Sequence, residues 1–242
     1  MNTRLFDYFD RIYVVYLPER TDRIKHMKHQ LTRLGLLTKA IWFPGCKYTD
    51  KGGFPGAGVR GCVMSQYTIL NQAAKDGVEK LLILQDDCQF SNRMVRQEQA
   101  IVDELANSYW DFAYLGHGAK IEDSKTFFVK VDAQKQIMLT HFCAYHGRAI
   151  PRLIKLMENS FNRLPGDAEG GPMYFDGYMN FFKSRNPDLV TLVAAPSLGW
   201  QYSNASNLNP SPLDQNKLLF PMVQLARTVK NSVQSLGYTM TT

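Results

Sequence analysis

The sequence predicts an α/β domain built on a mixed, mainly parallel sheet with helices on its faces. Patterns typical of strands and helices alternate from residue 11 onward, which favours parallel strands joined by helices. The run 81-LLIL-84 contains no polar residue, as expected of a strand that is buried on both faces. With 242 residues, 45% of them apolar, and no convincing linker, repeat or low-complexity tract, we expect one domain over 1–242 with its core at about 11–205.

The first part of the chain contains two pairs of a strand and a helix. A β-branched and aromatic run turns at Pro18, and apolar residues then recur at helical spacing, with Thr21 or Asp22 available as the helix cap. A glycine-rich stretch follows, and long loops in compact domains are usually functional. The expected order is a strand from residue 11, a helix closed by Gly35, a loop over 44–61, a helix over 62–77 and a strand over 80–84.

The second part of the chain continues the alternation and adds an antiparallel portion. The antiparallel portion is a predicted hairpin of 126–131 with 136–146. The other expected elements are a helix over about 93–106, a strand over 111–116, a helix over 148–159, a helix over 174–184 and a strand over 189–196.

The segment 214–237 is predicted to be an amphipathic helix. Its apolar residues fall along one stripe and its basic residues lie elsewhere. Such a helix can dock on the core, on a partner or peripherally on a membrane surface, and docking on the core is the commoner outcome.

Composition narrows the class of partner. The net charge is +6, from 28 Lys and Arg against 22 Asp and Glu, which favours an anionic ligand such as a phosphate-bearing molecule. The basic residues are dispersed and no stacking motif interleaves with them, so we expect no nucleic acid partner. The four cysteines form no CxxC pair, which argues against a zinc site or a redox motif. We see no apolar run typical of a signal or a membrane span, so we expect a cytoplasmic protein, and nothing predicts its oligomeric state.

Gln85, Asp86 and Asp87 stand at the end of the buried strand over 80–84. Ligands of open α/β sheets bind outside the carboxyl ends of the strands. Two neighbouring carboxylates fit a divalent cation that itself holds a pyrophosphate. The alternative is that either aspartate caps the next helix, a position for which Ser91 is also available. The residues alone leave both interpretations open.

Four segments in this order resemble glycosyltransferase family 25, which includes lipooligosaccharide β-galactosyltransferases and procollagen galactosyltransferases. They are 13-YVVYLPERTDR-23, 61-GCVMSQYTIL-70, 81-LLILQDDCQF-90 and 143-CAYHGRAIPRLI-154. The resemblance extends over about residues 11–203. It implies a GT-A-like fold and an inverting, Mn²⁺-dependent transfer of a sugar, galactose above all, from a UDP-sugar to a glycan or glycosylated acceptor.

The resemblance also carries residue roles. The residues that match the family's first turn would lie by the nucleotide, and those that match its acidic motif would hold metal and donor. Gly61 and Ser65 match the family's helix start, and 196-PSLGWQ-201 is similar to a late P-x-x-x-Q region. The donor-binding positions are by this resemblance Arg20, Asp22, Arg23, Gly61, Ser65, Gln85, Asp86 and Gln201, and the metal ligands are Asp86 and Asp87.

Two positions depart from the family's pattern. Gln85 stands where the family has an acid, and Gln66 stands where it has a histidine. Gln85 keeps a neutral oxygen ligand but no charge, which would weaken metal affinity or place ligation on the two aspartates. The alternative function is therefore a catalytically weakened module that binds a nucleotide-sugar or glycan without turnover.

An inverting transfer needs a carboxylate that takes the proton of the acceptor hydroxyl. Asp176 is the predicted base, because it resembles the family's downstream aspartate before an aromatic helix. Its alternative role is the N-cap of that helix, and Asp167 and Glu169 in the preceding loop are competitors. Trp200 is one of several aromatic residues able to stack on a sugar ring, although burial in the core is commoner.

Overall fold

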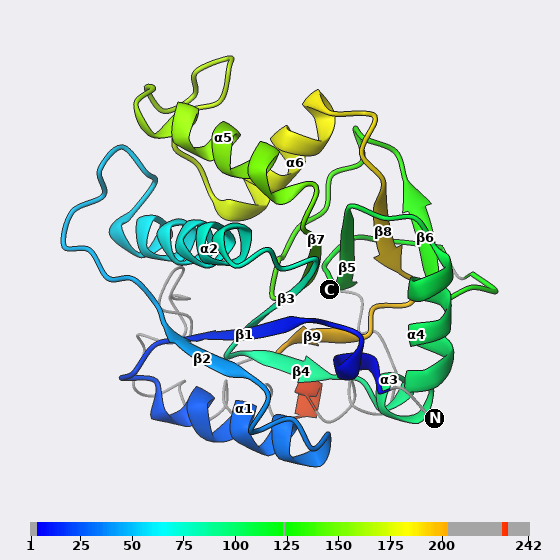
Figure 1. Cartoon of the computed structure of the whole chain (residues 1–242). Coiled ribbons are helices and arrows are strands. Elements are labelled where there is room, and N and C mark those ends of the chain that lie inside the picture. Colours follow the sequence, from blue (N-terminus) through cyan, green and yellow to red (C-terminus); the bar gives the residue numbers. More distant parts are fainter. Residues whose placement is uncertain (1–3, 123, 203–228, 232–242) are drawn as a thin grey trace.

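A nine-stranded sheet lies at the centre of the part of the chain that the structure describes (Figure 1). The structure is a computed structural model that describes residues 4–122, 124–202 and 229–231. The strand order is β2-β1-β3-β7-β5-β8-β6, and β4 and β9 pair with each other and join the sheet at β5. The strands are β1 (Arg11–Tyr16), β2 (Ile41–Pro44), β3 (Lys80–Gln85), β4 (Cys88–Phe90), β5 (Phe112–Gly116), β6 (Phe128–Val131), β7 (Phe142–His146), β8 (Thr191–Ala194) and β9 (Gly199–Gln201).

Helices cover both faces of the sheet, which confirms the predicted α/β architecture. α2, α5 and α6 lie on one face, and α1, α3, α4 and the short 3₁₀ helix η1 lie on the other (Figure 1). Their bounds are η1 (Leu5–Asp7), α1 (Thr21–Arg33), α2 (Ala57–Lys75), α3 (Asn92–Arg96), α4 (Glu98–Asn107), α5 (Ile150–Phe161) and α6 (Phe175–Arg185).

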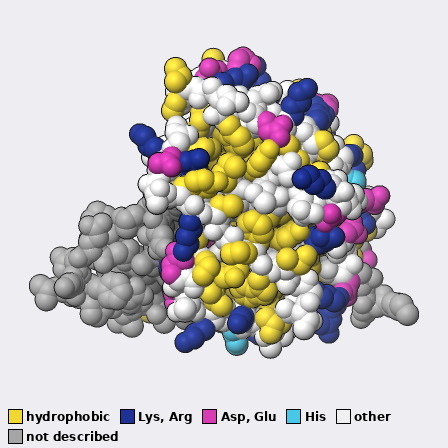
Figure 2. All heavy atoms as spheres, turned by 60° about the vertical axis from the view of Figure 1, so that its left-hand side comes forward, with side chains coloured by type: hydrophobic (Ala, Val, Ile, Leu, Met, Phe, Trp, Pro, Cys, Tyr) yellow, Lys and Arg dark blue, Asp and Glu magenta, His cyan; other side chains and the backbone are white. Residues whose placement is uncertain are grey.

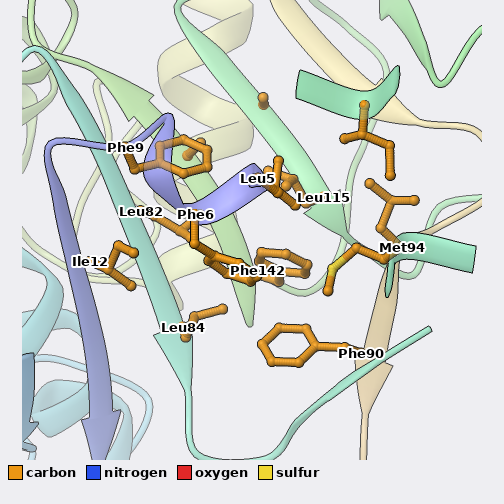
Figure 3. Close-up of a cluster of buried hydrophobic side chains, with 14 of the residues drawn as sticks. Leu5, Phe6, Phe9, Ile12, Leu82, Leu84, Phe90, Met94, Leu115 and Phe142 are labelled. Carbon is orange, nitrogen blue, oxygen red and sulfur yellow. The ribbon is translucent and has the colours of Figure 1, made fainter. Parts of the chain in front are cut away.

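The two covered faces explain the continuous apolar run of β3. Leu82 and Leu84 pack with Phe142 in the cluster drawn in Figure 3, on the face of α1 and η1. Leu81 and Ile83 belong to the second cluster, beneath α2, α5 and α6. Truncating a side chain at such a position to alanine typically costs about 2–5 kcal/mol. The strand that ends at the acidic pair is therefore firmly anchored on both faces.

Most strands run in one direction, as predicted, but the predicted hairpin is wrong. β1, β2, β3, β5, β8 and β9 share a direction, and β4, β6 and β7 oppose it. β7 lies between β3 and β5, and β6 pairs with β8 at the edge of the sheet. β7 is buried along all but its last residue, which suits an interior strand, whereas Lys130 of β6 is exposed, which suits an edge.

Two helix boundaries differ from those expected. α2 begins at Ala57, so the last residues of the loop predicted over 44–61 are helical. The helix predicted over 93–106 is divided at Gln97 into α3 and α4. β2, β4 and β9 were not predicted, because strands of three or four residues are too short to show a period.

The ends of α1 follow different rules. Gly35 has a φ of 67°, as the predicted glycine stop requires. The predicted cap is wrong, because the N-cap residue is Arg20, which makes no side-chain cap, and Thr21 and Asp22 lie inside the first turn. Asp22 forms an ion pair with Arg20 instead.

Basic side chains are spread over the face that Figure 2 presents, where they lie among acidic side chains and apolar patches. None of the helices in the described ranges combines the length and apolar character needed to cross a bilayer. The amphipathic segment predicted over 214–237 lies outside the described residues apart from 229–231.

Candidate functional site

A cavity of about 770 Å³ opens at the carboxyl ends of β1, β2, β3 and β5. Its size falls within the range of about 300–1,000 Å³ that is typical of small-molecule sites. The N-terminal half of α2 and β9 form further walls, and Arg23, Leu139 and Lys230 complete the lining. Of the residues proposed from the sequence, the cavity brings together Arg23, Gly61, Ser65, Gln85, Asp86, Asp87 and Gln201. Arg20, Asp22 and Asp176 are not among its lining residues.

The acidic pair is fixed to the end of β1. The backbone N–H of Asp86 donates to the carbonyl oxygen of Val15 at 3.0 Å, and Leu17 N–H donates to Asp86 Oδ2 at 3.1 Å. Asp86 and Asp87 are only 5% and 7% exposed. Both carboxylates are therefore held at the floor of the cavity by the central strands.

Neither aspartate caps the following helix. Ser91 is the N-cap residue of α3, and its hydroxyl oxygen accepts a hydrogen bond from Met94 N–H at 3.0 Å. The helix-cap interpretation of the pair is wrong, because the short strand β4 separates Asp87 from that helix. Both aspartates line the cavity instead.

Arg23, in the first turn of α1, holds both carboxylates. Its guanidinium lies 3.3 Å from Asp86 Oδ1 and 3.1 Å from Asp87 Oδ2. Burial nevertheless raises the pKa of Asp86, and it raises the pKa of Asp87 to about 6, with Arg23 opposing and the neighbouring Asp86 charge adding to the shift. One arginine thus compensates only part of two buried negative charges.

One oxygen of the acidic pair has no partner within the described ranges and is available to a metal ion. Asp87 Oδ1 is buried and has no hydrogen-bond partner among the described residues. The described residues contain no group of three or more His, Cys, Asp or Glu arranged to hold a metal. Mg²⁺-like ions commonly use one or two carboxylates and complete their shell with water and substrate phosphates. The two aspartates fit such a shared cation.

Asp87 predicts a pH dependence for the protein without divalent cations. Its pKa is about 6 in the folded chain against an ordinary value of 3.8, so the folded state prefers the protonated carboxyl. This contribution to stability is complete below about pH 4 and is lost as the pH rises through 6, a change of about 3 kcal/mol. In chelator, Asp87→Asn should match the wild type in urea unfolding at pH 4 and be more stable at pH 7.5. A less stable variant at pH 7.5 would show that the charged carboxylate supports the fold.

The start of α2 packs directly on the loop after β2. Ser65 Oγ accepts a hydrogen bond from Cys46 N–H at 2.8 Å and donates to the carbonyl oxygen of Gly61 at 2.7 Å. A Cβ at Gly61 would lie 2.3 Å from the carbonyl oxygen of Cys46. Gly61 therefore allows the close approach that forms this wall.

Gly61→Ala is expected to destabilise the fold by about 1–3 kcal/mol, the usual cost of overpacking. The added methyl meets a backbone oxygen, so the helix or the loop must shift. Thermal unfolding measures the effect. Gly56→Ala is the matched control, because nothing lies within 4 Å of a Cβ there. Equal melting temperatures for the two variants would contradict the packing argument.

Arg20 and Asp22 form a two-pronged ion pair at the start of α1. Arg20 Nε and Nη2 donate to the two Asp22 oxygens at 3.0 and 2.8 Å. The bond to Arg20 lowers the pKa of Asp22 to about 2. The positive charge of Arg20 also reaches Asp86 and Asp87, where it opposes the rise in their pKa values. Arg20 therefore adds positive potential near the cavity without lining it.

Asp176 is the second residue of α6 and is half-buried. It is not the N-cap, which is Tyr174, and its Oδ1 accepts a hydrogen bond from Gly177 N–H at 2.9 Å. Burial, with the charges of Asp176 and Asp87, raises the pKa of Cys62 to about 12, and Cys62 lines the cavity. The carboxylate of Asp176 thus lies close behind the cavity wall.

The two competing acids lie elsewhere. Glu169 forms an ion pair with Arg185 at 3.2 Å beside the groove between α5 and α6. Asp167 accepts a hydrogen bond from Glu169 N–H at 2.7 Å within the same loop. Neither residue lines the cavity that holds the acidic pair.

Comparison with curated proteins gives three informative relatives, whereas no family model matches the chain. The chain is 28% identical over 129 residues to Procollagen galactosyltransferase 1-B of Xenopus laevis, covering 45% of this chain and 21% of that protein. It is 26% identical over 215 residues to a glycosyltransferase 25 family member of Aedes aegypti, covering 77% and 35%. It is 27% identical over 129 residues to the human protein Inactive glycosyltransferase 25 family member 3, covering 45% and 22%. These relatives are members of glycosyltransferase family 25.

The match to family 25 is partial in length. The chain spans between 21% and 35% of the relatives named above. The fold also agrees with a solved structure, that of a glycosyltransferase involved in the glycosylation of the major capsid of PBCV-1. The two share a TM-score of 0.50 and 12% identity over 81% of this chain and 96% of that one. The GT-A-like fold implied by the sequence is confirmed.

The two departures from the family 25 pattern both face the cavity. Gln85 is half-buried at the end of β3, and its backbone N–H donates to the carbonyl oxygen of His141 at 2.9 Å. Gln66, on α2, is only 1% exposed and lines the cavity. Both positions are therefore placed where the identity of the side chain affects a bound ligand.

Sequence reasoning missed His117 and undervalued Trp200. His117 follows β5 directly, and its Nε2 donates to the carbonyl oxygen of Ala194 at 2.8 Å. Burial lowers its pKa, so the ring is neutral at physiological pH. The strand-end argument that selected Asp86 applies equally to His117. Trp200 lines the cavity and is not a core residue.

Proposed function

We propose that this chain is a glycosyltransferase that moves a sugar, with galactose the expected one, from a UDP-sugar to a glycan or glycosylated acceptor. The observation that carries the proposal is the buried pair Asp86 and Asp87, one of whose oxygens is unpaired at the floor of a large cavity. The family 25 relatives, one of them named as a galactosyltransferase, support the same activity.

Four residues of the chain have separate roles in an inverting transfer. Asp86 and Asp87 would hold Mn²⁺, which supplies positive charge to the departing diphosphate. Arg23 positions both carboxylates and adds a second positive charge beside them. Asp176 takes the proton from the acceptor hydroxyl as its oxygen attacks the anomeric carbon.

A second candidate function is a binding module that holds a nucleotide-sugar or glycan without turnover. Gln85 favours it, because a neutral amide replaces the acid of the family pattern next to the pair. One of the family 25 relatives is itself named inactive. Metal-dependent hydrolysis of a UDP-sugar in the absence of acceptor distinguishes the enzyme from the module.

Thermal unfolding against a panel of nucleotide-sugars, with and without Mn²⁺, tests the proposal. A ligand that binds only the folded chain stabilises it and so raises the melting temperature. At a ligand concentration of one hundred times the Kd, the stabilisation is about 2.7 kcal/mol. We expect a manganese-dependent rise with UDP-galactose. No rise with any UDP-sugar would overturn the proposal, and a rise without hydrolysis or transfer would favour the module.

A further inference from the structure

Two residues of the cavity bury polar atoms that no described residue satisfies. They are Gln66 Oε1, an acceptor, and Trp200 Nε1, a donor. The great majority of buried side-chain polar atoms in folded proteins have a hydrogen-bond partner, and leaving one without a partner costs about 1–3 kcal/mol. The two side chains therefore offer unused hydrogen-bonding capacity in the wall of the cavity.

The position of Gln66 relative to the acidic pair follows from its helix. Gln66 lies one turn after Cys62 on α2, and residues four apart share a helix face. The Cys62 thiol is close enough to Asp176 and Asp87 for both charges to act on it. α2 also packs against α5, α6 and β1. Cys62 and Gln66 both line the cavity, so this face of α2 is directed toward the acidic pair.

Trp200 lines the cavity from another element of the fold. It lies on β9, where it pairs with Gln89 of β4, and the adjacent Gly199 pairs with Gly116 at the end of β5. β5 is separated from β1 by β7 and β3 in the sheet. Trp200 is thus displaced from β1 and β2 in the sheet.

The two ends of the cavity differ in chemistry. The end beside β1 and β2 is lined by the rings of Tyr16 and Tyr48 and by Lys47, which forms an ion pair with Glu19 of the same lining. The lining from α2 and β9 presents the neutral amide of Gln66 and the indole of Trp200. A nucleoside and a sugar are attached to opposite ends of a diphosphate, so a diphosphate fixed at Asp86 and Asp87 sends them in opposite directions.

A sugar hydroxyl matches the unused groups. It donates one hydrogen bond and accepts others, and a side-chain amide offers both an acceptor and a donor. The indole adds a donor and an apolar ring face on which the carbon skeleton of a hexose packs. A nucleobase would also match an amide, but the rings of Tyr16 and Tyr48 offer it a stacking surface beside β1 and β2.

We propose that Gln66 and Trp200 hydrogen-bond hydroxyl groups of the transferred sugar and thereby select the donor. This inference rests on the proposed function. A site built to bond a hydroxyl rejects an analogue that lacks it, because the buried partner is then left unpaired. The two residues therefore discriminate between sugars attached to the same nucleotide.

Gln66→Met and Trp200→Phe test the inference, because each keeps the apolar bulk and removes the hydrogen-bonding atom. Calorimetric titration with Mn²⁺ measures the Kd of UDP and of UDP-galactose for each variant. We expect UDP to bind within about twofold of the wild type and UDP-galactose to bind about tenfold more weakly, the loss of one hydrogen bond. The free Gln66→Met protein should melt at or above the wild-type temperature, since the substitution removes an unsatisfied polar group.

Tyr48→Phe is the control. Tyr48 lies at the β1 and β2 end, so the substitution should change the Kd values of UDP and UDP-galactose by the same factor. Variants that bind UDP-galactose as the wild type does, or that lose UDP and UDP-galactose equally, would overturn the inference and leave the proposed function standing. A wild-type protein that binds neither UDP nor any UDP-sugar would overturn the proposed function, and this inference with it.

Discussion

Asp87→Asn is expected to abolish manganese-dependent binding of the UDP-sugar while leaving the fold intact. The substitution keeps the size of the side chain but removes the charge of the buried group that carries the unpaired oxygen. Loss of an outer-shell partner of a metal ligand already costs about 10–100-fold in affinity, so removing a ligand should cost more than about 100-fold. Asp86→Asn should also abolish manganese-dependent binding. It should leave the fold intact, because the amide oxygen of asparagine still accepts the hydrogen bond from Leu17 N–H.

Melting temperatures with UDP-galactose, with and without Mn²⁺, measure the effect of both substitutions. Asp188→Asn is a suitable control, because this exposed carboxylate pairs with Arg152 and does not line the cavity. If either cavity variant melts at a lower temperature and still binds the donor with manganese, the acidic pair is structural and the proposed site is wrong.

The fold could be predicted wherever its signal is local. β1 with α1, and α2 with β3, show strand and helix periods along continuous segments, so their existence and order followed from the sequence. The place of β7 between β3 and β5 could not be predicted, because strand pairing depends on tertiary packing. The run 136–146 looked like a hairpin arm since it follows another strand closely, and proximity in sequence was the wrong guide.

Some residues of the candidate site could be predicted from the sequence, and others could not. Asp86 and Asp87 were accessible to reasoning because a charged pair directly after a buried strand must emerge at a sheet edge. The unpaired state of Gln66 and Trp200 was not, because it depends on which atoms the fold fails to bring within hydrogen-bonding distance. Gln66 stood out in the sequence only as a departure from the family 25 pattern, without any indication of its role.

Asp176→Asn is expected to lower the rate of sugar transfer by about 10²–10⁴-fold, the usual contribution of a positioned acid or base, with UDP-sugar affinity within about twofold of the wild type. Asparagine cannot take the proton of the acceptor hydroxyl. Its amide oxygen can still accept the hydrogen bond from Gly177 N–H, so the start of α6 should be preserved. Initial rates of UDP release with acceptor, together with calorimetric titration of UDP-galactose, measure the two effects separately.

The separation of rate from affinity is what identifies the base. Asp176 lies behind the wall that Cys62 forms, and catalytic hydrogen bonds often tighten only when substrate binds. Glu169→Gln and Asp167→Asn are matched controls in the loop before α6. They should leave the rate unchanged, because Glu169 is paired with Arg185, Asp167 is bonded within its own loop, and neither charge acts on Cys62 in the cavity wall as that of Asp176 does. A rate lost in Glu169→Gln and kept in Asp176→Asn would move the base to that loop. Loss of donor binding in Asp176→Asn would instead show that this carboxylate supports the donor site and takes no proton.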